Sequence, residues 1–149
     1  MKLRVYLDTS VFSAYCDERV PERQALTQEF WQRFDEFEVT TSDLALEELR
    51  EAGDDGLRAR FEGLLANVAA HPVTQEIRDL ARCYLAAGVF SPAMLNDALH
   101  VAAAVLTRQD ILLSWNFKHL VNRRRRAQVN EVNVSQGLPT IEIIAPPEI

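Results

Sequence analysis

Residues 3–10 of the chain read LRVYLDTS, and this short stretch identifies the class of fold. Leu3–Leu7 is apolar and rich in strand-forming residues, which predicts a β-strand at the start of the chain. The polar run Asp8-Thr9-Ser10 follows that strand, and its residue types are typical of a turn or of a helix cap. The sequence therefore begins as an α/β protein does, with a strand that leads into a turn or a helix cap.

The rest of the chain alternates between short strand patterns and helical patterns. The expected strands are Leu3–Leu7, Val39–Thr41, Val68–Val73, Ile111–Trp115 and Thr140–Ile144. The expected helices are Glu22–Phe37, Asp43–Ala52, Leu57–Asn67, Thr74–Ala87, Pro92–Thr107 and one that contains the arginine run at 123–126. This alternation predicts an α/β fold in which helices flank a central parallel sheet on both faces. No repeat or linker interrupts it, so we expect a single domain over residues 1–149.

Length and composition indicate a globular protein. The chain has 149 residues, of which 48% are hydrophobic and 26% are charged, and these values are ordinary for one folded domain. The longest uncharged stretch, Cys83–Asn96, is shorter than the ~18 apolar residues that cross a membrane. Asp8 interrupts the N-terminal apolar run, and the two cysteines form no C-x-x-C motif. We therefore expect a cytoplasmic protein with no membrane segment and no disulfide framework.

Charge is distributed unevenly along the chain. The formal net charge of -6 counts against nucleic acid as a partner. However, residues 17–55 contain 13 acidic residues and four arginines, whereas residues 111–130 contain five basic residues and no acidic one. The five basic residues are Lys118, Arg123, Arg124, Arg125 and Arg126. The whole-chain charge therefore hides a basic segment that suits a polyanion.

Two polar residues directly follow expected strands. Asp8 ends the first strand, and Asn116 ends the fourth. In a parallel α/β sheet, ligands bind outside the carboxyl ends of the strands. Both residues are therefore expected at the edge of the sheet where a ligand binds.

The expected helix Pro92–Thr107 is apolar on every side after His100, which predicts a buried helix. Its polar exceptions, Asn96, Asp97 and His100, cluster in its first turns. The helix dipole stabilises a carboxylate there by only ~0.3–1 kcal/mol. Burial of an unpaired carboxylate costs far more. Asp97 therefore requires a cation or a hydrogen-bond donor as its partner.

The expected helix over 43–52 carries a third acid that faces inward. The apolar residues of this helix span an arc of about 140° at 100° per residue. Glu48 falls within that arc, whereas Glu47 and Glu51 fall outside it. If Asp8, Glu48 and Asp97 converge, they repel one another unless a divalent cation lies among them. Ligation by oxygen alone, without His or Cys, favours Mg²⁺ or Mn²⁺ over zinc.

Each of these residues also has a purely structural interpretation. The alternatives are a helix cap for Asp8, Thr9 and Ser10, a turn for Asn116, and solvated positions for Glu48, Asp97 and the arginine run. His100 also fits a core histidine with satisfied hydrogen bonds. The sequence contains no G-x-G-x-x-G, G-K-[ST], G-x-S-x-G or H-E-x-x-H motif. These absences disfavour a nucleotide cofactor, a serine hydrolase and a zinc site.

Four segments, taken together and in order, resemble the motifs of PIN-domain nucleases. They are YLDTSVF at 6–12, SDLALEEL at 42–49, NDALHVA at 96–102 and LSWNFKHL at 113–120. The C-terminal region, from Val132-Asn133 through Gly137 to Pro146-Pro147-Glu148, also resembles a branch of VapC-like toxins. The resemblance covers nearly the whole chain.

This resemblance implies a three-layer PIN-like α/β fold with strand order 3-2-1-4-5 and a ribonuclease that depends on Mg²⁺ or Mn²⁺. It also implies a toxin that a cognate antitoxin protein neutralises, and a homodimer. Carried over by position, Asp8, Glu48 and Asp97 are the implied metal ligands, and Asn116 completes the catalytic set. Many relatives have Asp at that fourth position. A neutral amide offers a carbonyl oxygen without a charge, which argues against a second tightly bound metal ion.

Further residues are expected to assist this site. Thr9 or Ser10 can contribute a hydroxyl group, and Asn96 is a further auxiliary residue. The basic segment is expected to hold the RNA backbone during metal-assisted hydrolysis, because phosphate contacts supply affinity. The expected antitoxin surface is the pocket between the Glu22–Phe37 helix and its neighbours.

Two other functions stay open at this point. One is a phospho-acceptor receiver module, which also has a parallel α/β sheet with acids at the strand ends. The other is a catalytically silent PIN-like module that binds RNA or a protein, and the neutral Asn116 keeps it open.

Overall fold

Five parallel strands form one sheet at the centre of the molecule, in the order β3-β2-β1-β4-β5. The computed structural model describes residues 1–149. The strands are β1 (Leu3–Leu7), β2 (Phe37–Ser42), β3 (Ala69–His71), β4 (Ile111–Leu113) and β5 (Glu142–Ile144). β1 is central, because Val5 pairs with Val39 of β2 on one side and with Ile111 of β4 on the other. The strand order that the sequence motifs implied is confirmed.

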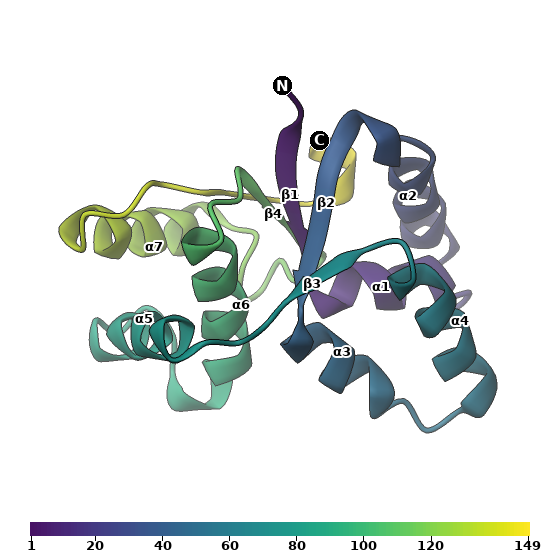
Figure 1. Cartoon of the computed structure of the whole chain (residues 1–149), viewed down its shortest axis with the longest axis horizontal. Helices are drawn as coiled ribbons and strands as arrows, with labels where there is room; N and C mark the ends of the chain where they lie inside the picture. The colour runs from purple at the N-terminus through teal and green to yellow at the C-terminus, as the bar shows by residue number, and fades with distance from the viewer.

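Helices cover both faces of this sheet (Figure 1). They are α1 (Thr9–Cys16), α2 (Pro21–Gln32), α3 (Asp43–Arg50), α4 (Asp55–Leu65), α5 (Gln75–Ala86), α6 (Leu95–Leu106) and α7 (Arg123–Ser135). In Figure 1, α5, α6 and α7 lie on one side of the sheet, and α1, α2 and α4 lie on the other. The molecule therefore has the three layers of an α/β fold. None of these helices combines the length and the apolar character that a membrane span needs.

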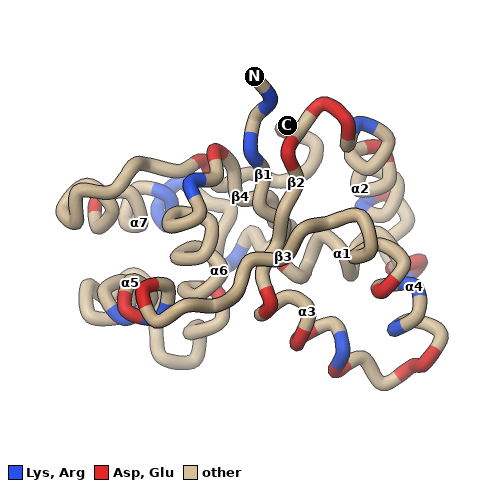
Figure 2. Tube along the Cα trace, viewed as in Figure 1, with Lys and Arg blue, Asp and Glu red and all other residues tan.

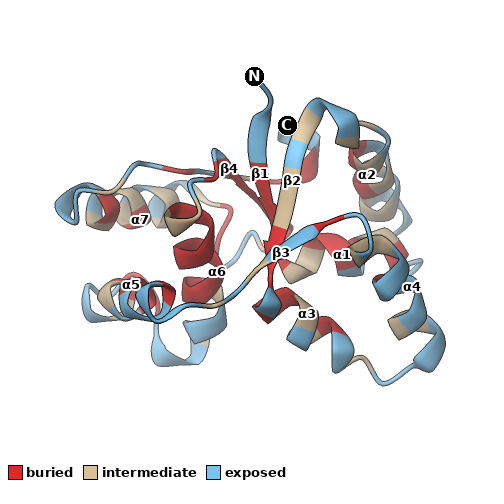
Figure 3. Ribbon diagram, viewed as in Figure 1, coloured by how far each residue is buried: buried red, intermediate tan, exposed pale blue.

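The core is built from the central strand and from α6. Val5, Tyr6 and Leu7 are fully buried, and Figure 3 shows this end of β1 in red. Every residue of α6 from Ala98 to Val105 is buried, which confirms the prediction from its apolar sequence. α6 contacts α5, β2 and β4. Because α6 is held against the central strands, the polar residues of its first turns come close to the carboxyl edge of the sheet.

Phe37 lies in a strand where the sequence predicted a helix. α2 ends at Gln32, a 3-10 turn follows over Phe34–Glu36, and Phe37 opens β2 opposite Leu3 of β1. The predicted helix end was wrong because Phe37 continues the spacing of the helical apolar stripe. The spacing instead reflects a tertiary contact, since the Phe37 ring stacks on the Phe30 ring with centroids 5.8 Å apart.

Two elements near the candidate site also differ from the prediction. β4 ends at Leu113 and not at Trp115, so that Ser114 and not Asn116 directly follows the strand. After β1, the chain forms the complete helix α1 over Thr9–Cys16, where the sequence indicated only a turn or a cap. Both differences arise in short elements, whose ends depend on their neighbours in the fold.

Candidate functional site

Asp8 lies at the junction between the central strand β1 and helix α1. It is the N-cap of α1, and its Oδ1 accepts hydrogen bonds from the backbone N–H of Ser10 at 3.0 Å and from Ser10 Oγ at 2.5 Å. Ser114 Oγ, just beyond β4, donates to Asp8 Oδ2 at 2.6 Å. Only 4% of Asp8 is exposed. This residue is therefore both a helix cap and a buried carboxylate at the carboxyl edge of the sheet.

No cationic side chain donates a hydrogen bond to Asp8. All of its hydrogen-bond donors are uncharged groups. Burial raises the pKa of Asp8, and the negative charge of Asp97 raises it further, although His100 and the two serines lower it. Hydrogen bonds from neutral groups offset only part of the cost of burying a carboxylate. The site therefore has an excess of negative charge that a cation can neutralise.

Glu48 faces the same edge of the sheet from helix α3. Its Oε1 accepts a hydrogen bond from Thr9 Oγ1 at 2.8 Å and lies 2.7 Å from His100 Nε2. Burial raises the pKa of this carboxyl group, but hydrogen bonds from His100, Thr9 and Asn96 outweigh burial and hold the pKa below its ordinary value. The Glu48 side chain is 29% exposed. The structure thus brings Thr9, one of the expected auxiliary residues, into contact with Glu48, and Asn96 lies near enough to lower the pKa of Glu48.

Asp97 lies in the first turn of α6. This helix begins at Leu95 and not at the predicted Pro92, because Pro92–Met94 forms a 3-10 turn before it. Asp97 Oδ2 lies 2.9 Å from His119 Nδ1, in the loop after β4, and the Asp97 side chain is 21% exposed. His119 is the kind of partner that the position of Asp97 requires, and the sequence did not identify it.

A chain of buried hydrogen bonds lies behind Glu48. Tyr6 Oη contacts both Ser42 Oγ and His100 Nδ1 at 2.6 Å, and the other ring nitrogen of His100 reaches Glu48. Burial raises the pKa of Tyr6 far above its ordinary value, so this hydroxyl keeps its proton. His100 is therefore a core histidine with both nitrogens satisfied, and it also orients Glu48. A polar residue in an otherwise apolar helix was the only sequence signal for this role.

The three carboxylates gather near one edge of the sheet, but they do not form a closed metal cage. No three His, Cys, Asp or Glu side chains are arranged so that they could hold a metal ion as they stand. Glu48 and Asp97 instead direct an oxygen to His100 and His119. The available donors suit Mg²⁺ or Mn²⁺, because carboxylate oxygens are the ligands that hard cations prefer. The chemistry of the three carboxylates therefore fits Mg²⁺ or Mn²⁺. Glu48 and Asp97, however, point an oxygen toward a histidine and not toward a shared metal position.

The loop after β4 connects the carboxylates to the basic segment. The backbone N–H of Asn116 donates to Ser114 Oγ at 3.0 Å, and Asn116 Oδ1 accepts from the backbone N–H of His119 at 2.9 Å. The Asn116 side chain thus stabilises a turn, which is the structural alternative considered for it. Ser114, which no sequence pattern singled out, is the residue of this loop that contacts Asp8.

The arginine run forms the first turn of helix α7, so the prediction that it lies in a helix is confirmed. Asn122 caps the helix, because its Oδ1 accepts from the backbone N–H of Arg125 at 2.8 Å. Figure 2 shows the basic start of α7 well separated from the acidic segments along α3 and α4. The two oppositely charged parts of the sequence therefore lie in different regions of the fold.

Two of the five basic side chains are engaged within the protein. Arg125 donates to the carbonyl oxygen of Val89, and its Cζ lies 4.6 Å from the centroid of the Phe90 ring. Arg126 donates to the carbonyl oxygen of Ile143 at 2.9 Å. The three that are exposed are Lys118, Arg123 and Arg124. The basic surface is therefore narrower than the sequence alone indicates.

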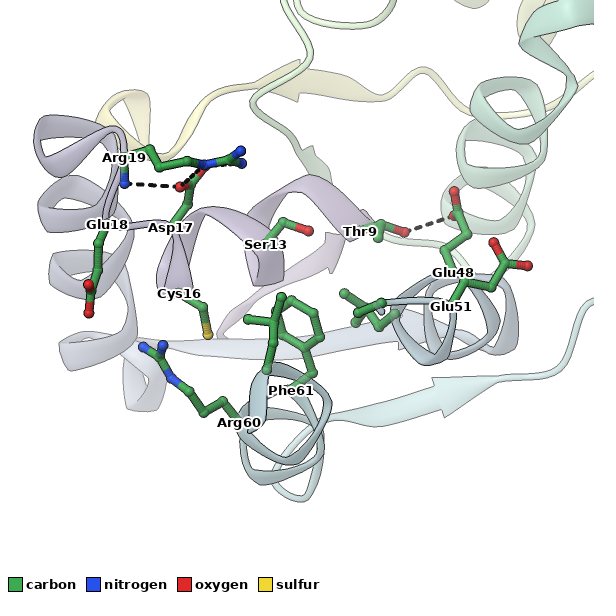
Figure 4. A pocket seen from close by; sticks show the side chains of 13 residues that line it. Thr9, Ser13, Cys16, Asp17, Glu18, Arg19, Glu48, Glu51, Arg60 and Phe61 are labelled. Carbon is green, nitrogen blue, oxygen red and sulfur yellow. Dashed lines mark hydrogen bonds and ion pairs between the residues drawn. The ribbon is translucent and has the colours of Figure 1, made fainter. Parts of the chain in front are cut away.

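A cavity of about 680 Å³ opens beside Glu48, between α1, α3 and α4 (Figure 4). Thr9 and Glu48 lie at one end of it, and the ion pair between Asp17 and Arg19 lies at the other. Phe61 of α4 forms part of the wall between them. The cavity connects Glu48 to solvent and has room for a ligand much larger than a metal ion.

Comparisons with known proteins identify the fold. No family model matches the sequence, and no curated protein matches it. The structure is similar to a chain of VapBC2 from Rickettsia felis, solved bound to a fragment of promoter DNA, with a TM-score of 0.61 and 11% identity over 96% of this chain and 98% of that chain. It is also similar to a chain of a toxin-antitoxin complex from Klebsiella pneumoniae, with a TM-score of 0.59 and 17% identity over 81% and 93%.

A third similar structure is VapBC-5 from Mycobacterium tuberculosis, a member of the VapBC family of toxin-antitoxin systems. Its TM-score is 0.53, and its identity is 21% over 95% of this chain and 98% of that chain. Identities of this size carry a conclusion about the fold and not about activity. The chain therefore has a VapC-like PIN-domain fold.

Proposed function

We propose that the protein is a divalent-metal-dependent ribonuclease that hydrolyses RNA phosphodiester bonds and acts as the toxin of a toxin-antitoxin pair. The observation that carries this proposal is Asp8, a carboxylate that is 4% exposed and has only neutral hydrogen-bond donors. Glu48 and Asp97 lie near the same edge of the sheet. A buried excess of negative charge at this edge is the environment that a bound cation stabilises.

The proposed ligands of Mg²⁺ or Mn²⁺ are Asp8, Glu48 and Asp97. When bound, such an ion polarises the phosphate and lowers the pKa of a water molecule. Ser10 and Ser114 hold Asp8 in one position. The other two carboxylates are partly exposed. In this proposal, both turn from their histidine partners toward Asp8 when the ion binds. Asp8 would thus be a fixed ligand, and Glu48 and Asp97 would be ligands that move when the ion binds.

Three exposed basic residues are the proposed contacts to the RNA backbone. Lys118 lies in the loop after β4, two residues beyond Asn116, and Arg123 and Arg124 open α7. Contacts to phosphate supply affinity without reading the sequence of the RNA. Arg125 and Arg126 would support this surface from within, because both are bonded to backbone carbonyl groups.

The proposed protein partner is a cognate antitoxin. The structures similar to this chain are described as VapBC proteins or as a toxin-antitoxin complex, which supports a partner of that kind. A cavity of about 380 Å³ lies between α1, α2 and the loop after β4, and Ser10, Arg23 and Asn116 line part of it. An antitoxin segment bound there would cover the candidate site. The proposed homodimer rests on the sequence resemblance alone.

A second candidate is a PIN-like module that binds RNA or a protein without cleaving RNA. The observation that favours it is the pairing of Glu48 and Asp97 with histidines in place of a group that could hold a metal ion. A calorimetric titration of wild type and Asp97→Asn with Mg²⁺ and with Mn²⁺ separates the two candidates. The nuclease requires that the wild type binds the ion and that Asp97→Asn does not, whereas the silent module has no such requirement.

A cleavage assay tests the proposed activity. Wild-type protein, Asp97→Asn and the control Asp79→Asn, which alters an exposed acid on α5, are incubated with labelled single-stranded RNA in Mg²⁺, in Mn²⁺ and in EDTA. We expect the wild type and the control to cleave only with a metal ion, and Asp97→Asn to lose cleavage. Equal cleavage by wild type and Asp97→Asn would overturn the assignment. Labelling by acetyl phosphate would instead identify a receiver module.

A further inference from the structure

We propose that Phe117 is a stacking platform for one unpaired RNA base beside the carboxylates, an inference that rests on the proposed function and extends it to a base-binding subsite. Phe117 is 48% exposed, and it is the one exposed residue among the twelve aromatic residues of the chain. A single exposed apolar side chain needs no explanation by itself. Its position and the rigidity of its support are what indicate a role.

Phe117 lies between the two loop residues that contact the acidic site. Ser114, on one side of it in the sequence, donates to Asp8, and His119, on the other side, pairs with Asp97. The loop is therefore tied to two of the three carboxylates, with Phe117 in the middle of the tied segment. A base that stacks on this ring would belong to a nucleotide close to the phosphate that the carboxylates face.

Hydrogen bonds hold the backbone at Phe117 in one conformation. Asn122 Nδ2 donates to the carbonyl oxygens of Phe117 at 3.0 Å and of Lys118 at 3.3 Å. The backbone N–H of Phe117 donates to the carbonyl oxygen of Trp115 at 3.0 Å. A loop backbone held in this way does not have to be ordered when a ligand stacks on the Phe117 ring, which favours binding.

A buried aromatic ring supports Phe117 from the side. The rings of Trp115 and Phe117 meet edge to face, with centroids 6.1 Å apart and an angle of 71° between their planes. Trp115 is itself fixed, because its indole N–H donates to Thr27 Oγ1 at 2.8 Å and the Arg23 guanidinium lies 4.9 Å from its ring centroid. The exposed Phe117 ring is therefore anchored to the core through the buried Trp115.

The basic residues near Phe117 favour a polyanion as the ligand of this surface. The adjacent Lys118 is exposed, and it lines a cavity of about 680 Å³ together with Arg124 at the start of α7. Residues 111–130 contain no acidic side chain. Phe117 does not itself line this cavity, but it directly precedes Lys118, which does. An exposed aromatic ring together with a basic groove binds single-stranded nucleic acid, because bases stack on the ring while phosphates contact the cations. Stacking accepts any base, so this subsite would position the RNA without selecting its sequence.

Equilibrium binding of a short single-stranded RNA of mixed sequence, measured in EDTA so that no metal supports cleavage, tests the proposal. The variants are Phe117→Ala, Phe117→Leu and Phe117→Trp, with Val134→Ala as the control at an exposed apolar position near the far end of α7. We expect Phe117→Ala to weaken binding by about 5- to 100-fold, Phe117→Leu to weaken it similarly, and Phe117→Trp and Val134→Ala to bind as wild type does. The salt dependence of binding should stay unchanged in Phe117→Ala, since the basic side chains still bind the same phosphates.

A scan of the RNA with single abasic nucleotides provides the second measurement. We expect one position at which the missing base weakens binding to wild type but not to Phe117→Ala, because the same stacking interaction has already been removed. An unchanged abasic penalty in Phe117→Ala, or wild-type affinity in Phe117→Ala or Phe117→Leu, would overturn the platform while leaving the proposed function standing. Failure of the wild type to bind RNA in EDTA would also overturn the platform, whereas the proposed function is decided separately by the cleavage assay with Mg²⁺ and Mn²⁺.

Discussion

Ser114 Oγ donates a 2.6 Å hydrogen bond to Asp8 Oδ2, and this buried contact joins residues 106 positions apart in the sequence. It places a neutral donor against a buried carboxylate. Burial is the chief cause that raises the pKa of Asp8, and the charge of Asp97 adds to it, while His100, Ser10 and Ser114 act in the opposite direction. A cationic side chain at the place of Ser114 would have completed a structural ion pair. Because Ser114 supplies a neutral hydroxyl, the negative charge of the carboxylates near Asp8 stays in excess.

We expect Asp8→Asn to raise the midpoint of thermal unfolding in EDTA by a few degrees, because the substitution removes buried negative charge and keeps an oxygen that can cap α1. Differential scanning calorimetry of wild type, Asp8→Asn and the exposed control Asp79→Asn measures the effect. A clear drop in the midpoint for Asp8→Asn would mean that the ionised cap stabilises the fold more than its burial destabilises it.

The stability of the wild type should also depend on pH through Asp8. Its pKa is raised in the folded state, chiefly by burial, so the folded protein binds this proton more tightly than the unfolded chain does. The free energy of unfolding therefore falls as pH rises from about 4 through the raised folded-state pKa, and it stays lowered above that pKa. The stability advantage of Asp8→Asn over wild type should grow across that range and then become constant. Denaturant unfolding at a series of pH values checks this sign.

Addition of Mg²⁺ should reverse the order of stability. A ligand that binds only the folded protein stabilises it by about 2.7 kcal/mol at a concentration 100 times its Kd. We expect Mg²⁺ to raise the unfolding midpoint of wild type and to leave that of Asp8→Asn unchanged, and EDTA should restore the original midpoint. Equal responses of the two proteins to Mg²⁺ would show that Asp8 is not a ligand.

The hydroxyl group of Tyr6 should contribute to stability through its two buried partners. Tyr6→Phe leaves Ser42 Oγ and His100 Nδ1 without this hydrogen bond, and an unsatisfied buried polar group costs about 1–3 kcal/mol. We expect the unfolding midpoint to fall by several degrees. The matched control is Tyr15→Phe, at a half-buried tyrosine. An equal effect of both substitutions would show that the buried network is not the source of the destabilisation.

The exposed and half-buried arginines should behave differently on substitution. Paired Arg123→Ala and Arg124→Ala changes should weaken RNA binding and reduce the slope of log affinity against log salt by about 0.7 for each phosphate that the variant no longer neutralises. Arg125→Ala should instead lower the unfolding midpoint, because it removes the interactions with Val89 and Phe90. Fluorescence anisotropy across salt concentrations and thermal unfolding measure the two effects. An unchanged salt slope in the double variant would make its arginines an ordinary solvated surface.

Much of the fold was predictable because its signals are local. The apolar stretch at 3–7 and the all-round apolar helix after His100 each report burial through residues that are neighbours in the sequence. The ends of helices and strands were less predictable. Phe37, for example, belongs to strand β2, but its ring packs on Phe30 of helix α2. Local spacing cannot distinguish these two cases, since both place an apolar group against the same helix.

The candidate site was predictable in its residues and not in their partners. Asp8 and Asp97 could be singled out because a carboxylate beside apolar sequence requires compensation. The compensating groups lie far away along the chain, as His119 does from Asp97 and His100 does from Glu48. The expectation that Arg125 holds the RNA backbone had the same weakness, because its contact with Val89 forms only when α7 packs near the end of α5.

Residue order and periodicity were therefore enough to determine the α/β class, the buried α6 and the three acids that lie near strand ends or helix starts. These properties depend on short-range patterns, which any fold of this chain must satisfy. Only the tertiary structure decided which groups form hydrogen bonds with the acids and which arginines stay exposed. It also decided that Phe117, between Ser114 and His119 in the sequence, is exposed to solvent. Those outcomes depend on the packing of distant segments, and hydrogen bonds at 2.6 to 2.9 Å form only after that packing has placed the atoms.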